Sequence, residues 1–314
     1  MLCNLGRTHR LTLNKRTCMK LNVGFIGYGE VASHFARRLA ENGCSVVVHD
    51  VLADNEGGLA TLKDRIGSTP VTVVGFEALF KHCDIVLSTV VTQAALNVAQ
   101  RSAQQLRPGQ YYVDLNSTSP SIKQAISNII QPSAALFVEG AILGALGATG
   151  ANTKILLGGE QASELSARLN GAGLNTLFFS PTLGQASTFK MLRSVFSKGI
   201  EAILIETMLA ATESGVDEAL WADIVHTVTH TPFEKTASNW IVSHLNACER
   251  RYFEMQQVVE TLEELHVTPC VTQGTLAFFK RSADLQLSHQ TREQPVDGVS
   301  QAINVMRTAL NSHR

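Results

Sequence analysis

The chain has 314 residues, of which 45% are hydrophobic and 17% charged, with a formal net charge of -1 at pH 7. This is the composition of an ordinary globular protein with room for two domains. The balanced charge and the 6% aromatic content argue against a nucleic-acid-binding surface, and every apolar run is interrupted before it reaches membrane-spanning length. We therefore expect a protein that acts on a small molecule, with no nucleic-acid or membrane partner.

The cysteines and the N-terminal residues bear on where the protein works. Residues 1–18 are basic and free of acidic residues, and Met19 is followed almost at once by an apolar run. We expect residues 1–18 to be a disordered extension, or a start codon placed too early, with an organelle-targeting peptide as the alternative. Widely spaced cysteines without metal-type or redox-type pairing indicate reduced, mostly buried thiols of a cytoplasmic protein. They are Cys3, Cys18, Cys44, Cys83, Cys248 and Cys270.

A glycine turn follows the first expected strand, residues 21–26. The turn reads Gly27-Tyr28-Gly29-Glu30-Val31-Ala32. Its first glycine lets the chain reverse, and its second removes a side chain that would keep backbone N–H groups from a pyrophosphate. Phosphate would then bind at the helix N-terminus. The pattern predicts dinucleotide binding through residues 27–31; a glycine turn that merely packs is the alternative.

The second expected strand ends in an acidic residue. A helix over residues 31–39 ends at Asn42-Gly43, and an apolar strand over residues 45–50 follows. Asp50 lies about twenty residues beyond the glycines, where a carboxylate binds both ribose hydroxyls of NAD and repels the 2′-phosphate of NADP. We therefore expect NAD, with NADP less favoured.

The pattern then keeps alternating between strands and helices. Strands are predicted over residues 71–74, 84–90, 111–115, 135–138 and 154–157, and helices over residues 58–66, 76–82, 93–105 and 120–130. This alternation indicates a doubly wound Rossmann sheet of the α/β class, whose ligands collect at the carboxyl ends of the strands. Thr89, Val90 and Asn116 are accordingly expected beside the coenzyme, and residues 116–120 and a loop over residues 140–144 complete the candidate site.

From residue 185 the pattern becomes almost entirely helical. The proline-free segment 185–214 has apolar residues on more than one side, which is typical of a helix buried in a bundle or against a second subunit. Further helices are predicted over residues 218–228, 233–247, 252–265 and 272–281. We expect a Rossmann domain over residues 19–184, an all-α domain for substrate binding and dimerisation over residues 185–314, and a homodimer.

Four segments occur in the order found in β-hydroxyacid dehydrogenases, a superfamily that includes 6-phosphogluconate and 3-hydroxyisobutyrate dehydrogenases. They are residues 27–32, 114–120, 139–145 and 184–190. Residues 250–255 resemble the uncharacterised C-terminal domain of a phosphogluconate-dehydrogenase-like branch, so the resemblance covers most of residues 20–285. It implies an NAD-dependent enzyme with Lys190 as catalytic acid/base. It also implies that Ser117, Thr118, Gly140 and Ala141 hold the carboxylate of a small anionic hydroxy acid.

Lys190 suits that chemistry. The hydroxyl proton needs an acceptor within about 3 Å while hydride leaves the carbon. A lysine serves if burial and a cationic nicotinamide lower its pKa toward neutrality. Ser187, Lys190, Ser194 and Lys198 recur at helical spacing, so the sequence predicts one polar stripe facing the cleft. The alternative is a lysine that packs along the helix and reaches water with its ammonium group.

The helical region departs from the family pattern at two positions. Ser194 stands where an asparagine is usual, and Ser197 stands where 6-phosphogluconate dehydrogenase has a glutamate that serves decarboxylation. We expect hydride transfer without decarboxylation and a substrate contact from Ser194. A shifted acid at Glu201, one turn further on, is the alternative.

Arg251 is the remaining candidate for substrate binding, because an arginine fork suits a carboxylate or phosphate. Pairing of Arg250 and Arg251 with neighbouring glutamates on a solvated surface is the alternative. His226 and His230 have no further ligand at metal spacing, so no metal is expected.

Three functions compete at this point. The first is an NAD-dependent dehydrogenase that oxidises a small hydroxy acid. The second is an imine or keto-acid reductase of the same fold, and the third is an NAD-binding sensor without turnover.

Overall fold

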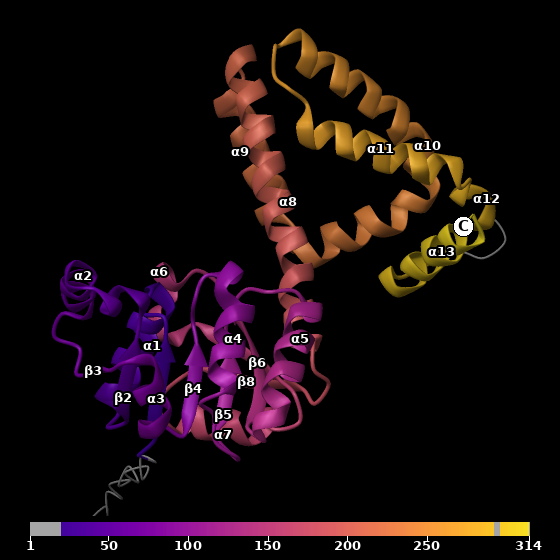
Figure 1. The fold of residues 1–314 in the computed structure, drawn as a ribbon. Helices are drawn as coiled ribbons and strands as arrows, with labels where there is room; N and C mark the ends of the chain where they lie inside the picture. The colour runs from indigo at the N-terminus through magenta and orange to yellow at the C-terminus, as the bar shows by residue number, and fades with distance from the viewer. Residues whose placement is uncertain (1–19, 292–295, 314) are drawn as a thin grey trace, which may run out of the picture. The chain divides into compact units, whose positions relative to one another are not determined.

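The structure is a computed structural model that describes residues 20–291 and 296–313. It divides into two compact units, the first ending at Arg193 and the second beginning at Ser194. The expectation for residues 1–18 lies outside the described residues. Figure 1 shows the helices and strands of both units.

The first unit is built on an eight-stranded sheet with the order β3-β2-β1-β4-β5-β6-β7-β8. Neighbouring strands run parallel except β6 and β7, which are antiparallel. The strands are β1 (Asn22–Ile26), β2 (Ser45–His49), β3 (Thr72–Val73), β4 (Ile85–Ser88), β5 (Tyr111–Asp114), β6 (Leu136–Leu143), β7 (Lys154–Gly158) and β8 (Thr176–Ser180). The predicted doubly wound α/β fold is confirmed.

Helices cover this sheet (Figure 1). They are α1 (Glu30–Glu41), α2 (Glu56–Ile66), α3 (Phe76–His82), α4 (Ala95–Ala103), α5 (Pro120–Ile130), α6 (Leu146–Thr149) and α7 (Ala162–Gly171), with short 3-10 turns between some of them. Successive strand residues point to opposite faces of a sheet. Accordingly Ile85 and Leu87 of β4 join one buried apolar cluster, and Val86 between them joins a second. Burial on both faces explains why these strands are continuous apolar runs.

One prediction within the first unit was wrong. The expected loop over residues 140–144 is largely strand, because β6 runs through Leu143 and pairs with β7. Gly140 serves packing there: a Cβ at this position would lie 2.3 Å from Leu115 Cδ2. The helix α7 and the strand β8 were not predicted, since β8 has exposed central residues and lacks a buried apolar run.

The second unit is helical. Helix α8 (Gln185–Ser214) begins in the first unit and has the predicted bounds. It is followed by α9 (Asp217–His230), α10 (Phe233–Glu264), α11 (Cys270–Asp284), α12 (Leu287–Thr291) and α13 (Val299–Ser312). Helices α10 and α11 lie side by side (Figure 1). Over the described ranges, no helix is both long and apolar enough to span a membrane.

The predicted interruption between residues 247 and 252 does not exist, because α10 is continuous there. The segment contains neither glycine nor proline, so nothing in the backbone ends the helix. Leu245 and Cys248 are fully buried in the apolar cluster of this unit, which packs this part of α10 against its neighbours. Helix α13 was not predicted.

Candidate functional site

The glycine turn adopts a conformation that requires its first glycine. Gly27 has φ +87°, and a Cβ there would lie 2.8 Å from the backbone oxygen of Thr89. The hydroxyl of Thr89 donates to the Gly27 oxygen at 2.7 Å, which ties β4 to the turn. A Cβ on Gly29 would meet no atom within 4 Å, so the space in front of the helix start is open. This open space suits a phosphate at the N-terminus of α1.

Asp50 lies beside this turn at the end of β2. Its carboxylate accepts hydrogen bonds from the backbone N–H of Tyr28 at 2.7 Å and of Leu52 at 3.0 Å. The Tyr28 side chain is fully buried, so this residue contributes to the turn through its backbone. The backbone oxygen of Tyr28 in turn accepts a hydrogen bond from the Arg65 guanidinium at 3.1 Å.

A cavity of about 300 Å³ opens between the glycine turn and the ends of β2 and β4. Predicted coenzyme residues that line it are Gly27, Gly29, Asp50, Thr89 and Val90. Glu30 is exposed and Val31 half-buried on the first turn of α1, outside this lining. The adjacent open helix start and the lined cavity fit a dinucleotide.

Two arginines that no sequence pattern indicated line the same cavity. They are Arg65, from the last turn of α2, and Arg101, from the last turn of α4. The Arg101 guanidinium lies 4.2 Å from the centre of the Phe76 ring, which also lines the cavity. This is a cation–π contact. The lining of this cavity therefore carries positive charge from Arg65 and Arg101 as well as the negative charge of Asp50.

A second group of polar residues gathers at the carboxyl end of β5. Asn116 donates from Nδ2 to the Ser88 hydroxyl at 3.0 Å, and it also hydrogen-bonds to Asp114. Ser88 directly precedes Thr89, so this group is connected to the glycine turn through adjacent residues. Within the described part of the chain, Asn116 Oδ1 and Thr118 Oγ1 are buried without a hydrogen-bond partner. Buried polar atoms normally have partners, so these two atoms stand out in the group.

The remaining residues of the predicted carboxylate site differ in position. Ser117 is exposed, and its backbone oxygen accepts from Thr92. Gly140, within β6, takes part through its backbone oxygen, which lies 3.4 Å from Lys123 Nζ. Ala141 is buried against Leu156 and Ala186, so its side chain packs.

Lys123 is a buried lysine that the sequence analysis did not single out. Its side chain is 1% exposed, and its Nζ lies 2.7 Å from Asp114 Oδ2 in a buried ion pair. It also donates to the backbone oxygens of Asp114 and Asn116, both at 2.8 Å. A sequence indication existed, because Lys123 shares the buried face of α5 with Ile126 and Ile130.

Glu139 holds the start of α8. Its side chain is fully buried, and its carboxylate accepts from the backbone N–H groups of Gly184 at 2.7 Å, Ala186 at 3.1 Å and Ser187 at 3.3 Å. N–H groups at a helix start have no partner within the helix and favour a negative charge. Glu139 therefore fixes the helix that carries Lys190.

Lys190 is half-buried in the first unit. Burial lowers the pKa of its ammonium group, the positive charge of Lys123 lowers that pKa further, and the negative charge of Asp114 opposes both effects. Lys190 is therefore within electrostatic reach of the polar group at the end of β5. Ser187, which was predicted to share a polar stripe with Lys190, is buried, and its hydroxyl donates back to the Gly184 backbone oxygen at 3.0 Å.

Ser194 and Arg251 belong to the second unit. Arg251 donates to the Ser243 hydroxyl at 2.9 Å, whereas the neighbouring Arg250 pairs with Glu254 as expected for a solvated helix surface. The rings of His226 and His230 stack 4.4 Å apart. No group of three potential metal ligands occurs among the described residues.

Comparisons with known proteins agree with this geometry. Residues 22–169 match the NAD binding domain of 6-phosphogluconate dehydrogenase, and residues 211–282 match a domain of unknown function, DUF1932. A solved conserved protein of unknown function, described as structurally similar to 3-hydroxyacid dehydrogenases, is 32% identical. The match covers 85% of this chain and 99% of that protein, with a TM-score of 0.56.

Two more distant proteins are similar to this chain over part of its length. The mitochondrial 3-hydroxyisobutyrate dehydrogenase of Rattus norvegicus is 22% identical over 66% of this chain and 62% of its own length. An imine reductase from Myxococcus stipitatus, solved with NADP+, has a TM-score of 0.68 over 84% of this chain and 94% of that chain. At 17% identity it shows a common fold.

Proposed function

The chain belongs to the β-hydroxyacid dehydrogenase superfamily, in the branch that combines the 6-phosphogluconate-dehydrogenase type of NAD-binding domain with DUF1932, and we propose that it oxidises a small hydroxy acid with NAD. One observation carries the proposal. Lys190 is half-buried, its pKa is lowered, and it is within electrostatic reach of Asp114. Asp114 is the last residue of a strand whose carboxyl end lies at the same sheet edge as the glycine turn. Ligands of doubly wound sheets collect at that edge.

In the proposed reaction the neutral amine of Lys190 accepts the proton of the substrate hydroxyl, and in the reverse direction the ammonium group returns it. When bound, the coenzyme supplies the hydride acceptor. The hydroxyls of Ser117 and Thr118 would donate to the substrate carboxylate in fixed directions. The unpartnered Thr118 Oγ1 supports this role. Asn116 does not line the cavity beside the glycine turn, and it would contribute its unpartnered Oδ1.

The roles of Ser194 and Arg251 as substrate contacts remain predictions. Arg251 donates to the neutral Ser243 hydroxyl, and a guanidinium held by a neutral partner is able to bind an anion. We propose hydride transfer without decarboxylation because Ser197 cannot supply a proton in the way a carboxylic acid can.

A coenzyme-coupled screen tests the proposal. The full chain is incubated with NAD and a panel of short hydroxy acids and their phosphates, and in parallel with NADH and the matching keto acids and imines. Turnover of a hydroxy acid supports the proposal. Turnover of imines alone would favour the reductase, and NADH binding with an inert panel would favour the sensor.

The preference for NAD rests on Asp50, while Arg65 and Arg101 in the same cavity favour a 2′-phosphate. We expect the protein to bind NADH more tightly than NADPH. Asp50→Asn should lower the ratio of the NADPH dissociation constant to the NADH dissociation constant about tenfold, because the repulsion between the Asp50 carboxylate and the 2′-phosphate is removed. Fluorescence titration measures both constants. Asp54→Asn, an equal charge change on an exposed residue nearby, is the matched control; an equal effect of both variants would contradict the role of Asp50.

We also propose a homodimer. Helix α8 exposes Leu192 to 65%, Val195 to 72% and Phe196 to 55%, and further along it Ile205 and Leu209 to 56% each. Monomeric proteins rarely leave apolar patches of this kind uncovered. Multi-angle light scattering should give twice the chain mass of 34.0 kDa, and Val195→Asp should shift the mass toward one chain. A wild-type mass of one chain at working concentration would rule out the dimer.

A further inference from the structure

Lys123 occupies a place that is unfavourable for a cation in two ways. It is almost completely buried, and it lies in the first turn of α5, where the helix dipole favours negative rather than positive charge. A buried ion pair also adds little stability compared with apolar packing of similar volume. A role in stability alone therefore explains this lysine poorly.

The contacts of its ammonium group connect three neighbouring segments. Nζ binds Asp114 Oδ2 and the Asp114 backbone oxygen at the end of β5, the Asn116 oxygen just beyond it, and, at a longer distance, the Gly140 oxygen within β6. Asp114 and Glu139 are register partners in these two strands. The lysine thus fastens the segment 114–116 to β6, just before the unpartnered Thr118 hydroxyl.

The same pair lies within electrostatic reach of Lys190. Lys123 from α5 and Asp114 from β5 both act on the charge of Lys190, and the effect of Lys123 is the larger. Glu139 of β6 is the third buried charged group of this region, and its oxygens are taken up by backbone N–H groups at the start of α8.

We propose that Lys123 is a positioning residue of the active site: its ammonium group, paired with Asp114, holds the turn 116–118 against β6 and keeps a positive charge within electrostatic reach of Lys190. The inference rests on the proposed function of Lys190. Lys123 itself is sealed from solvent and acts on the substrate only through the turn and through Lys190.

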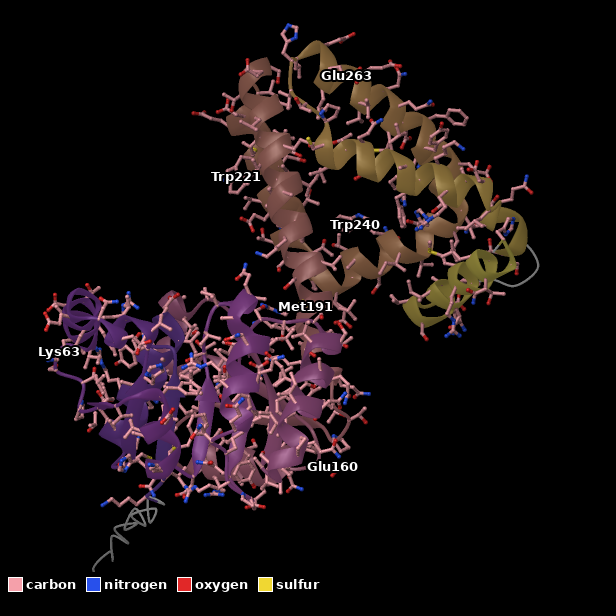
Figure 2. All side chains as sticks on the ribbon, in the orientation of Figure 1. Lys63, Glu160, Met191, Trp221, Trp240 and Glu263 are labelled. Atoms are coloured by element: carbon pink, nitrogen blue, oxygen red, sulfur yellow. The ribbon has the colours of Figure 1, made fainter. Side chains whose placement is uncertain are left out.

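Competitive labelling tests the inference without any turnover. Trace acetic anhydride is added to the full chain over a range of pH, and mass spectrometry follows acetylation of Lys190, which reports the fraction of neutral amine. The variants are Lys123→Met and the double variant Lys123→Met with Asp114→Asn. Lys63→Met, on an exposed residue of α2 labelled in Figure 2, is the control.

We expect the labelling midpoint of Lys190 to be lowest in the wild type, higher in the double variant and highest in Lys123→Met. The single variant removes the repelling cation and leaves the attracting Asp114 carboxylate, whereas the double variant removes both charges. The control should match the wild type. If Lys123→Met does not fold, the labelling midpoint of Lys190 in the double variant is compared with that in the wild type. The double variant avoids an uncompensated buried charge, because both members of the pair are then neutral.

Coinciding midpoints in the wild type and the folded variants would reduce Lys123 to a structural role and overturn the inference. Because the labelling needs no substrate, a wild type that turns over nothing would refute the proposed function while this measurement still gives its answer.

Discussion

Replacing Lys190 with methionine should lower kcat for the hydroxy acid about a hundredfold to ten-thousandfold, the range that positioned acid/base groups contribute. Methionine has a similar length and packs well in irregular apolar surroundings, so helix α8 should keep its structure. The affinity for NADH should stay within about twofold of the wild type, because no residue lining the cavity beside the glycine turn is changed. Steady-state kinetics and NADH fluorescence titration measure the two quantities.

Lys154→Met is the matched control for the loss of a lysine from the first unit, since Lys154 is exposed at the start of β7. It should leave kcat unchanged. A Lys190→Met variant that keeps the wild-type kcat would remove the proposed catalyst and leave a lysine that packs along α8.

The second large effect is expected at Glu139. Glu139→Gln should lower the free energy of unfolding by about 2–4 kcal/mol, because charge-assisted hydrogen bonds to the N–H groups of Gly184, Ala186 and Ser187 are weakened or lost in a fully buried site. The start of α8 loosens with it, so kcat should fall as well. Urea denaturation measures the change in stability.

The exposed Glu160, labelled in Figure 2, provides the control. Glu160→Gln makes the same chemical change in the same unit and should alter the free energy of unfolding by less than about 0.5 kcal/mol. Equal effects of the two variants would show that the buried carboxylate does not hold the helix start.

The sequence predicted most of the first unit because its local patterns and its final structure agree. The runs that form β1, β2, β4 and β5 are buried on both faces of the sheet, so they are continuous apolar segments that any pattern analysis finds. The glycine turn was equally readable, because Gly27 needs a positive φ that few other residues adopt. Ser119 caps α5 as its position before Pro120 indicates.

The errors have physical causes that a single sequence does not reveal. Glycines over residues 140–144 suggested a loop, but Gly140 is a glycine because Leu115, which directly follows the neighbouring strand β5, leaves no room for a side chain. Such long-range crowding has no local pattern. The break expected inside α10 does not occur: the helix is continuous, and Arg251 donates to the Ser243 hydroxyl two turns earlier on the same helix.

The candidate site was predicted in part. Asp50, Thr89 and Asn116 follow strands, and strand ends mark ligand sites in this fold, so position alone identified them. Lys123 and Glu139 were missed because their importance lies in partners distant in sequence, the β5 carboxyl end for one and the α8 start for the other. Arg65 and Arg101 come from separate helices, and only the folded chain brings them to one cavity.

The pH dependence of the reaction in both directions tests the central claim most directly, using an acid that the screen identifies. Oxidation needs the neutral amine of Lys190, so kcat/KM should rise with pH through a midpoint below the ordinary lysine value of 10.5, because burial and Lys123 lower this pKa. Reduction needs the ammonium group, so kcat/KM should fall with pH through the midpoint of the same group. Both titrations should vanish in Lys190→Met. Profiles that persist unchanged in that variant would contradict the account, because the titrating group would then be some other residue.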